Sequence, residues 1–222
     1  MRFRLLLVLA ALSLAPMASA ATYSLNDWCF YVNSLDINQS CNSGGGLANV
    51  PSADPGATDL LHLQGDGLGT LTVTLAPGNY NVFAIFNYNI DGNGSGEYAT
   101  ALGNLAVGQV YSVNTEGSVT TTGPLDSTNH CASPGCADVA VGLGYTNVDV
   151  PIGSVGTVTF TASTTAPTDP NTFSVQQTNP NTTNSLNLTS ALQISAVPEP
   201  GAMGLMGGGL GAMLLLLRRR KA

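Results

Sequence analysis

One short stretch of this 222-residue sequence has the oxygen-rich composition of a calcium loop. Residues 91–96 read Asp-Gly-Asn-Gly-Ser-Gly, which matches the first half of an EF-hand-type loop except for serine at its fifth position. The oxygen ligands would come from Asp91, Asn93, Ser95 and Glu97. The twelfth position is Leu102 instead of a bidentate Glu, so a plain hairpin turn is the favoured interpretation. A weak calcium site is the alternative hypothesis, and no other cofactor is expected.

Only His62 and His130 can act as bases near neutral pH, and neither belongs to a recognisable nucleophile or metal motif. His62 lies in an apolar run and is expected to point outward from a strand. Residues 65–69 lack the third-glycine spacing of a dinucleotide-binding loop and read as a turn. A pair of carboxylates could hydrolyse a glycoside, but their separation in space is not encoded in their spacing along the chain. We therefore expect a protein that is not an enzyme.

The four cysteines form two close pairs along the chain, Cys29 with Cys41 and Cys131 with Cys136. In an oxidising compartment two disulfides are the expected state, and three connectivities are possible. We favour the local pairing because each pair closes a short loop, which stabilises the fold by about 3 and about 2 kcal/mol. A zinc site with His130 beside Cys131 is the alternative, but the C-x-x-C spacing of such sites is absent.

The elements that must position these residues read as short strands separated by turns rich in Gly, Thr, Asn and Ser. Apolar residues alternate with polar ones over 71–75, and residues 77–79 read as a turn. Over 80–90 both faces are apolar, which predicts a central strand covered on both sides. Further strands are expected at 110–114, 139–145, 155–162, 173–177 and 186–194, with a long surface connection at 167–180. The expected fold class is all-β, an antiparallel β-sandwich with a jelly-roll-like arrangement as an open variant.

Charge is distributed very unevenly. Residues 21–197 hold twelve carboxylates and no Lys or Arg, a formal charge of −12, because all six basic residues lie near the two ends. Nucleic-acid binding requires cationic side chains to neutralise phosphates, so a nucleic-acid partner is excluded.

Residues 1–20 have the pattern of a secretory signal peptide: two arginines, an apolar run over 5–14 and a small-residue cleavage site at 18–20. Near the other end, residues 201–217 are uncharged and would form roughly 25 Å of helix, close to the lower limit for a membrane span. The basic tail comes next and consists of Arg218, Arg219, Arg220 and Lys221. Positive charge favours the cytoplasmic side, so residues 21–197 are expected to lie across the membrane as the ectodomain.

Directly before that span stand Pro198, Glu199 and Pro200. A Pro-Glu-Pro motif, a glycine-rich apolar helix and an arginine cluster, in this order, resemble the PEP-CTERM sorting signal of Gram-negative bacteria. The resemblance covers residues 197–222 and implies recognition by an exosortase, a membrane-embedded cysteine transpeptidase, with removal of the helix and tail. The expected division is a signal peptide at 1–20, a β-sandwich ectodomain at 21–197 and a sorting signal at 198–222.

Two functions agree with this pattern. The resemblance implies export across the inner membrane, a membrane-anchored precursor, and then a non-catalytic role at the cell surface or in an exopolysaccharide matrix. The alternative is a carbohydrate-binding module that recognises the cell's own polysaccharide. Such a module usually presents flat aromatic rings, and the candidates are Trp28, Tyr80, Tyr88, Tyr98 and Tyr145.

Overall fold

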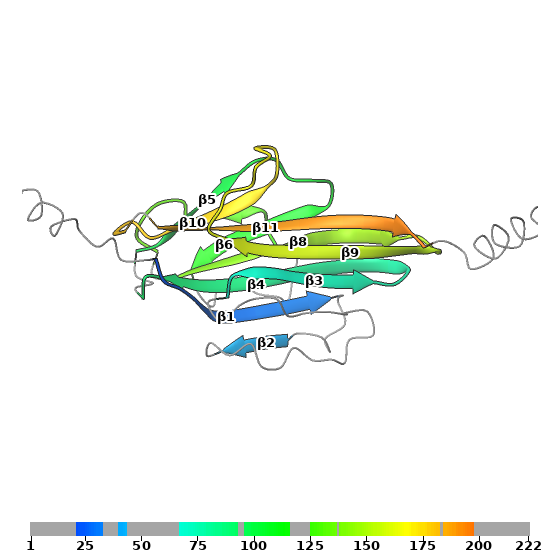
Figure 1. The fold of residues 1–222 in the computed structure, drawn as a ribbon, viewed down its shortest axis with the longest axis horizontal. Helices are drawn as coiled ribbons and strands as arrows, with labels where there is room; N and C mark the ends of the chain where they lie inside the picture. Colours follow the sequence, from blue (N-terminus) through cyan, green and yellow to red (C-terminus); the bar gives the residue numbers. More distant parts are fainter. Residues whose placement is uncertain are drawn as a thin grey trace, which may run out of the picture.

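The computed structural model describes residues 21–32, 40–43, 67–92, 96–115, 125–136, 138–182 and 184–197. Their regular structure is all β and forms two sheets whose strands run along the long axis of the domain (Figure 1). Sheet A has the order β2-β1-β4-β8-β6-β7 and sheet B the order β3-β9-β11-β10-β5. Every neighbouring strand pair is antiparallel except β6 with β7.

The strands of sheet A are β1 (Tyr23–Val32), β2 (Ser40–Ser43), β4 (Gly78–Ile90), β6 (Gln109–Thr115), β7 (Thr128–Asn129) and β8 (Val139–Val150). Those of sheet B are β3 (Gly69–Leu75), β5 (Tyr98–Leu102), β9 (Ser154–Ser163), β10 (Ser174–Thr178) and β11 (Ser185–Ala196).

The two sheets face each other across one apolar core. In β9 the inward residues alternate strictly with outward Thr and Ser, which is the period of a strand with one buried face. The Phe160 ring of β9 lies 6.4 Å from both Phe30 of β1 and Phe86 of β4, measured between ring centroids. Burial of one such side chain contributes about 1.5–3 kcal/mol. Contacts of this kind between the sheets confirm the expected sandwich.

Strand β4 is the central strand of sheet A, as the sequence predicts. It pairs with β1 on one side and β8 on the other, and the run from Val82 to Tyr88 is buried on both faces. Gly144 of β8 lies opposite Phe83, and a Cβ built there would be 2.1 Å from the Val82 carbonyl oxygen. Only glycine fits at that point of the ladder.

Two neighbouring turns connect the sheets. The β3–β4 turn at residues 76–77 and the β8–β9 turn at residues 151–153 each carry the chain from one sheet into the other. The two connections run together, because β3 pairs with β9 while β4 pairs with β8. The two turns therefore join the sheets at the same end of the sandwich.

A buried polar bridge crosses the core. Gln109 of sheet A donates from Nε2 to the carbonyl oxygen and the hydroxyl of Ser190 in sheet B, at 3.0 Å each. The hydroxyl of Tyr145 donates to the same Ser190 carbonyl at 3.2 Å, and burial raises the pKa of this phenol. Because polar groups in a core must be paired, these bonds favour one relative position of the two sheets.

The strand expected at 173–177 is confirmed as β10 (Ser174–Thr178), so the connection expected at 167–180 is shorter than predicted. The inward residues of β10, Val175 and Gln177, are wholly buried. The irregular part ends at Phe173, which is also buried.

Candidate functional site

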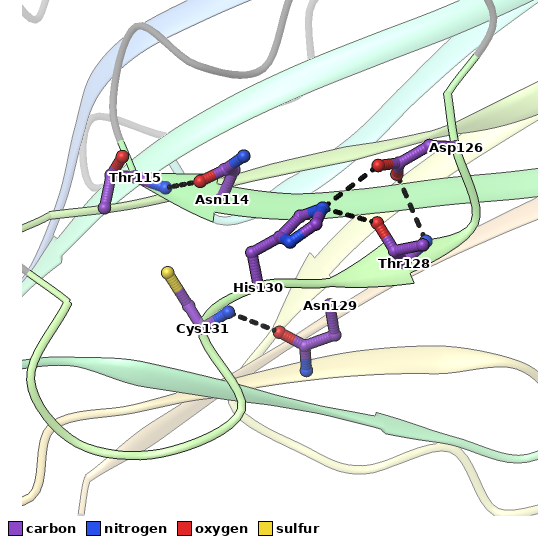
Figure 2. A network of polar contacts seen from close by, with 7 residues as sticks. All are labelled: Asn114, Thr115, Asp126, Thr128, Asn129, His130 and Cys131. Carbon is purple, nitrogen blue, oxygen red and sulfur yellow. Dashed lines mark hydrogen bonds and ion pairs between the residues drawn. The ribbon is translucent and has the colours of Figure 1, made fainter.

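The polar cluster with the most reactive composition lies on the chain between β6 and β8 (Figure 2). His130 Nε2 is 3.1 Å from Oδ2 of Asp126 and 2.7 Å from Oγ1 of Thr128, and Asp126 Oδ1 accepts the Thr128 N–H at 3.1 Å. Hydrogen bonds from the Thr128 hydroxyl and from His130 hold the pKa of Asp126 well below its usual range. About half of the Asp126 side chain and half of the His130 side chain are exposed, so this pair is open to solvent.

The geometry of this cluster does not form a catalytic relay. In a nucleophile–base–acid relay the histidine uses one ring nitrogen for the acid and the other for the nucleophile. Here Asp126 and Thr128 both contact Nε2, and a carboxylate can only accept, so Nε2 carries the proton. That nitrogen therefore cannot remove a proton from the Thr128 hydroxyl.

The cluster is part of a rigid connection between the sheets. The Cys131–Cys136 disulfide closes this loop, as predicted from the short spacing. Ala99 of β5 donates its N–H to the Cys131 carbonyl at 2.8 Å, and Asn129 Nδ2 donates to the Ala99 carbonyl at 2.7 Å. The Asn129 side chain also accepts the Cys131 N–H at 2.9 Å. The loop thus joins sheet A to the edge strand of sheet B.

The other predicted disulfide involves Cys29 and Cys41. Cys29 is disulfide-bonded, and its backbone lies directly opposite Cys41 in the antiparallel pairing of β1 with β2. The Cys41 side chain lies outside the part of the chain whose side chains are described.

Asp91, the first predicted calcium ligand, closes one end of the sandwich. It adopts a left-handed backbone with φ of 62°, exchanges backbone hydrogen bonds with Thr22 through its N–H and Oδ1, and accepts at Oδ2 from Thr182 and Asn184. The bond from the Thr182 hydroxyl is 2.5 Å long and is the largest reason that the pKa of Asp91 is lowered. Asp91 therefore ties the start of β1 to the turn between β10 and β11.

Glu97, the last predicted ligand, is a wholly buried carboxyl group. Its Oε1 accepts the Ile90 N–H at 2.9 Å and its Oε2 accepts Gln177 Nε2 at 2.5 Å. Gln177 Nε2 also donates to the Tyr88 carbonyl at 2.8 Å, so the group links β4 to β10. Burial raises the pKa of Glu97, against the opposing effect of these hydrogen bonds.

The remaining predicted calcium ligands, Asn93 and Ser95, lie outside the described residues. Among the residues that are described, no three His, Cys, Asp or Glu side chains are grouped as a metal site would require. Asp91 and Glu97 are both engaged by protein hydrogen bonds, so an ion at this loop would have to share or replace those donors.

The aromatic candidates for sugar stacking do not share a surface. Trp28, Tyr88 and Tyr145 are buried in the core. Tyr80 and Tyr98 are partly exposed, but Tyr80 belongs to sheet A and Tyr98 to sheet B. An aromatic platform of the kind expected from the sequence is therefore not formed by these five residues.

The last described residues lead directly into the Pro-Glu-Pro segment. Strand β11 ends at Ala196, and the Val197 N–H donates to the Gly153 carbonyl in the β8–β9 turn at 2.7 Å. Pro198, Glu199, Pro200, the predicted span and the basic tail lie outside the described residues. Within the described ranges no helix is long and apolar enough to cross a bilayer.

Comparison with known families identifies the segment that begins where β11 ends. Residues 196–221 match the family described as the PEP-CTERM protein-sorting motif. The chain carries a PEP-CTERM sorting signal. Comparisons with curated proteins and with solved structures found no match. The PEP-CTERM signal implies an exported protein that an exosortase recognises and sorts to the cell surface.

Two features of these sites were not predicted from the sequence. The first is the Asp126–Thr128–His130 cluster, which forms because Ser127 adopts a left-handed backbone with φ of 54° and the Thr128 N–H donates back to Asp126 Oδ1. The second is the burial of Glu97, which no local pattern reveals because its partner Gln177 is 80 residues away.

Proposed function

We propose that this protein is a non-catalytic component of the cell surface or extracellular matrix of a Gram-negative bacterium. It crosses the inner membrane, remains as an anchored precursor, and reaches the surface after an exosortase acts at the Pro-Glu-Pro motif. Its partners are the exosortase and the exopolysaccharide of the matrix.

The observation that carries this proposal is the junction between the domain and the sorting signal. The sorting motif begins at residue 196, where β11 ends, and the last backbone hydrogen bond of the described fold is made by Val197. Processing within residues 198–200 removes the sorting segment without cutting a strand. The sandwich is therefore the part that is delivered, and its role does not require the sorting segment.

A structural role agrees with the chemistry of the described surface. The one acid–histidine–hydroxyl cluster found in the described ranges is arranged to hold a loop, because both partners contact the same ring nitrogen. Its neighbours are a disulfide and backbone bonds to Ala99, which stabilise the connection between the sheets. Such a disulfide agrees with an exported protein, because disulfides form and persist in oxidising compartments outside the cytoplasm.

The test is intact-mass measurement of protein collected from the envelope and the medium of the producing bacterium. The expected product begins at Ala21 and lacks Arg218 to Lys221. Replacement of Pro198, Glu199 and Pro200 by alanine should leave unprocessed precursor in the membrane, while Thr72→Val, on the outer face of sheet B, should not. If most molecules outside the cell keep the basic tail, the protein is a plain single-pass anchor and the proposal fails.

A carbohydrate-binding module is the second candidate, and one observation favours it. The outer face of sheet B contains a groove between strands β9 and β11 and the connection at residues 164–173, lined mostly by Thr, Ser and Asn residues that expose mainly apolar surface. A weak calcium site at residues 91–97 also remains part of the proposal, with a dissociation constant on the order of 10⁻⁴ to 10⁻³ M as in extracellular modules.

A further inference from the structure

The groove on sheet B is lined mostly by Thr, Ser and Asn side chains, and the surface that these residues expose to it is mainly apolar. Its floor is formed by Thr161 and Ser163 of β9 and by Asn187 and Thr189 of β11, which lie side by side in the antiparallel ladder. Its wall is the connection at residues 164–173, which includes Ala166 and Pro167. The volume is about 280 Å³, just below the range of typical small-molecule pockets. The space is suited to one small ring rather than to a large cofactor.

Asn187 is the side chain in the floor that lacks a full set of partners. It is only 2 % exposed, and its Oδ1 accepts a hydrogen bond from Gln176 Nε2 at 3.5 Å. Its Nδ2 group donates to no acceptor among the described residues. Because Oδ1 faces the Gln176 donor, Nδ2 is directed to the other side of the amide. The Nδ2 atom keeps contact with solvent, so a ligand oxygen at this point would replace water as its acceptor.

The wall of the groove is held in place by several backbone contacts. The Thr165 N–H donates to Ser163 Oγ at 3.0 Å, and the Asn104 N–H donates to the Asn171 carbonyl at 3.2 Å. Gly103 adopts φ of 75°, and a Cβ there would be 2.3 Å from the Thr172 carbonyl oxygen. The loop therefore depends on a close approach that only glycine allows, and the groove is formed before any ligand arrives.

The charge distribution disfavours anionic ligands. The residues that line the groove are all uncharged, and the five strands of sheet B contain no Asp, Glu, Lys or Arg. Residues 21–197 nevertheless have a formal charge of −12. An anionic ligand would find no cation here and would be repelled by the rest of the domain. A neutral ligand rich in hydroxyl groups meets both conditions.

We propose that this groove binds one unit of a neutral polysaccharide. The Asn187 amide donates to a sugar oxygen, the hydroxyls of Thr161, Ser163 and Thr189 exchange hydrogen bonds with sugar hydroxyls, and Pro167 packs against the C–H face of the ring. This inference rests on the proposed matrix role and assigns it a site. One small ring with few direct contacts is expected to bind weakly, with a dissociation constant on the order of 1 mM. Useful retention then arises from many units along one polymer.

The test uses the processed protein collected outside the producing cell. Ligand-detected NMR measures binding of the methyl glycosides of glucose, mannose and galactose, with glucuronic acid as the charged comparison. The groove variants are the pair Thr161→Val with Thr189→Val, and separately Asn187→Val. The matched control is Thr72→Val with Thr159→Val, which removes two hydroxyls from the same face outside the groove. Gly103→Ala displaces the wall without changing the floor.

The expected result is binding of at least one neutral glycoside by the wild type and the control, and a loss of about tenfold or more in the groove variants and in Gly103→Ala. Asn187→Val should lose binding while its unfolding midpoint changes little, because Asn187 makes one long side-chain bond, from Gln176 Nε2, and that group also donates to Ser185 Oγ. If no neutral glycoside binds the wild type, or if the groove variants bind as well as the control, the site is refuted. A change of oligomeric state in the groove variants would show that a second copy occupies the groove, which also refutes it.

The proposed matrix role is tested apart from the groove. If the groove variants lose glycoside binding but remain in the matrix, both proposals hold and the domain has further contacts. If wild-type protein stays in the membrane as precursor, the matrix role fails whatever the groove binds.

Discussion

Substitution of the buried Glu97 tests how much the hydrogen bonds that link β4 to β10 stabilise the sandwich. Glu97→Ala removes the acceptor of two buried N–H donors, that of Ile90 and one of the two on Gln177 Nε2, whose other N–H donates to the Tyr88 carbonyl. Each donor left without a partner costs about 1–3 kcal/mol, so the loss of unfolding free energy is expected to be about 2–6 kcal/mol. Glu97→Gln keeps the volume and one acceptor, and it serves as the matched variant.

The difference in unfolding free energy between the wild type and Glu97→Gln should depend on pH. Burial raises the folded-state pKa of Glu97 above 4.5, so folding favours the protonated form. Its contribution to stability is complete below pH 4.5 and is lost as pH rises through the folded-state pKa. Glu97→Gln is neutral at every pH, like the protonated acid, but its amide nitrogen cannot accept the bond from Gln177 Nε2. We expect the stability of this variant relative to the wild type to be lowest in acid and to increase with pH.

The assay is urea unfolding at a series of pH values, monitored by the fluorescence of Trp28, which is buried and is the one Trp of the chain. The difference between wild type and Glu97→Gln cancels the titration of groups that both proteins share. A difference that stays constant with pH would refute the buried-acid interpretation. A loss of less than about 1 kcal/mol in Glu97→Ala would refute the role of the two hydrogen bonds.

Other contacts in the described residues lead to four more expected outcomes. Gly144→Ala should destabilise the sandwich by about 1–3 kcal/mol or more, since its Cβ would meet the Val82 carbonyl, and thermal unfolding measures this. Replacing Cys131 and Cys136 by Ser should cost about 2 kcal/mol, and non-reducing peptide mapping should recover this disulfide and Cys29–Cys41 with no free thiol. Because its pKa is lowered, Asp91 should stabilise the fold above pH 3.8 and lose that effect as pH falls through the folded-state pKa, a dependence that Asp91→Asn should reduce. Millimolar calcium, compared with magnesium, should raise the unfolding midpoint of the wild type more than that of Asp91→Ala; an equal rise would mean that the ion acts through diffuse charge.

The strands with regular alternation could be predicted from the sequence, and those with an interruption could not. In β3, Leu71, Val73 and Leu75 occupy successive inward positions, and this simple period identifies the strand. In β1 the register shifts between Leu25 and Asp27, so the inward residues Leu25 and Trp28 are three apart. A period of two therefore fails within β1, and local sequence does not mark it as a strand.

In the candidate sites too, contacts between residues close in sequence could be predicted, and contacts between residues far apart in sequence could not. The Cys131–Cys136 disulfide spans five positions, so its spacing alone predicts it. The groove on sheet B joins β9 to β11 and the connection between β9 and β10, and its floor exists only once Asn187 lies opposite Ser163. The Glu97–Gln177 bond likewise requires the two sheets to meet. Pairing across the fold creates these features, and no pattern within one segment contains them.

The position of β11 also determines how the domain bears mechanical load. Any tether attached through residue 197 pulls along β11, which lies inside sheet B between β9 and β10 (Figure 1). Ten registered residue pairs join β11 to β9 between Asn187 and Ala196, and the pull runs parallel to that ladder. The hydrogen bonds are then loaded together in shear instead of opening one after another from the end. Drag on a protein held at its C-terminal end would thus meet the whole ladder at once.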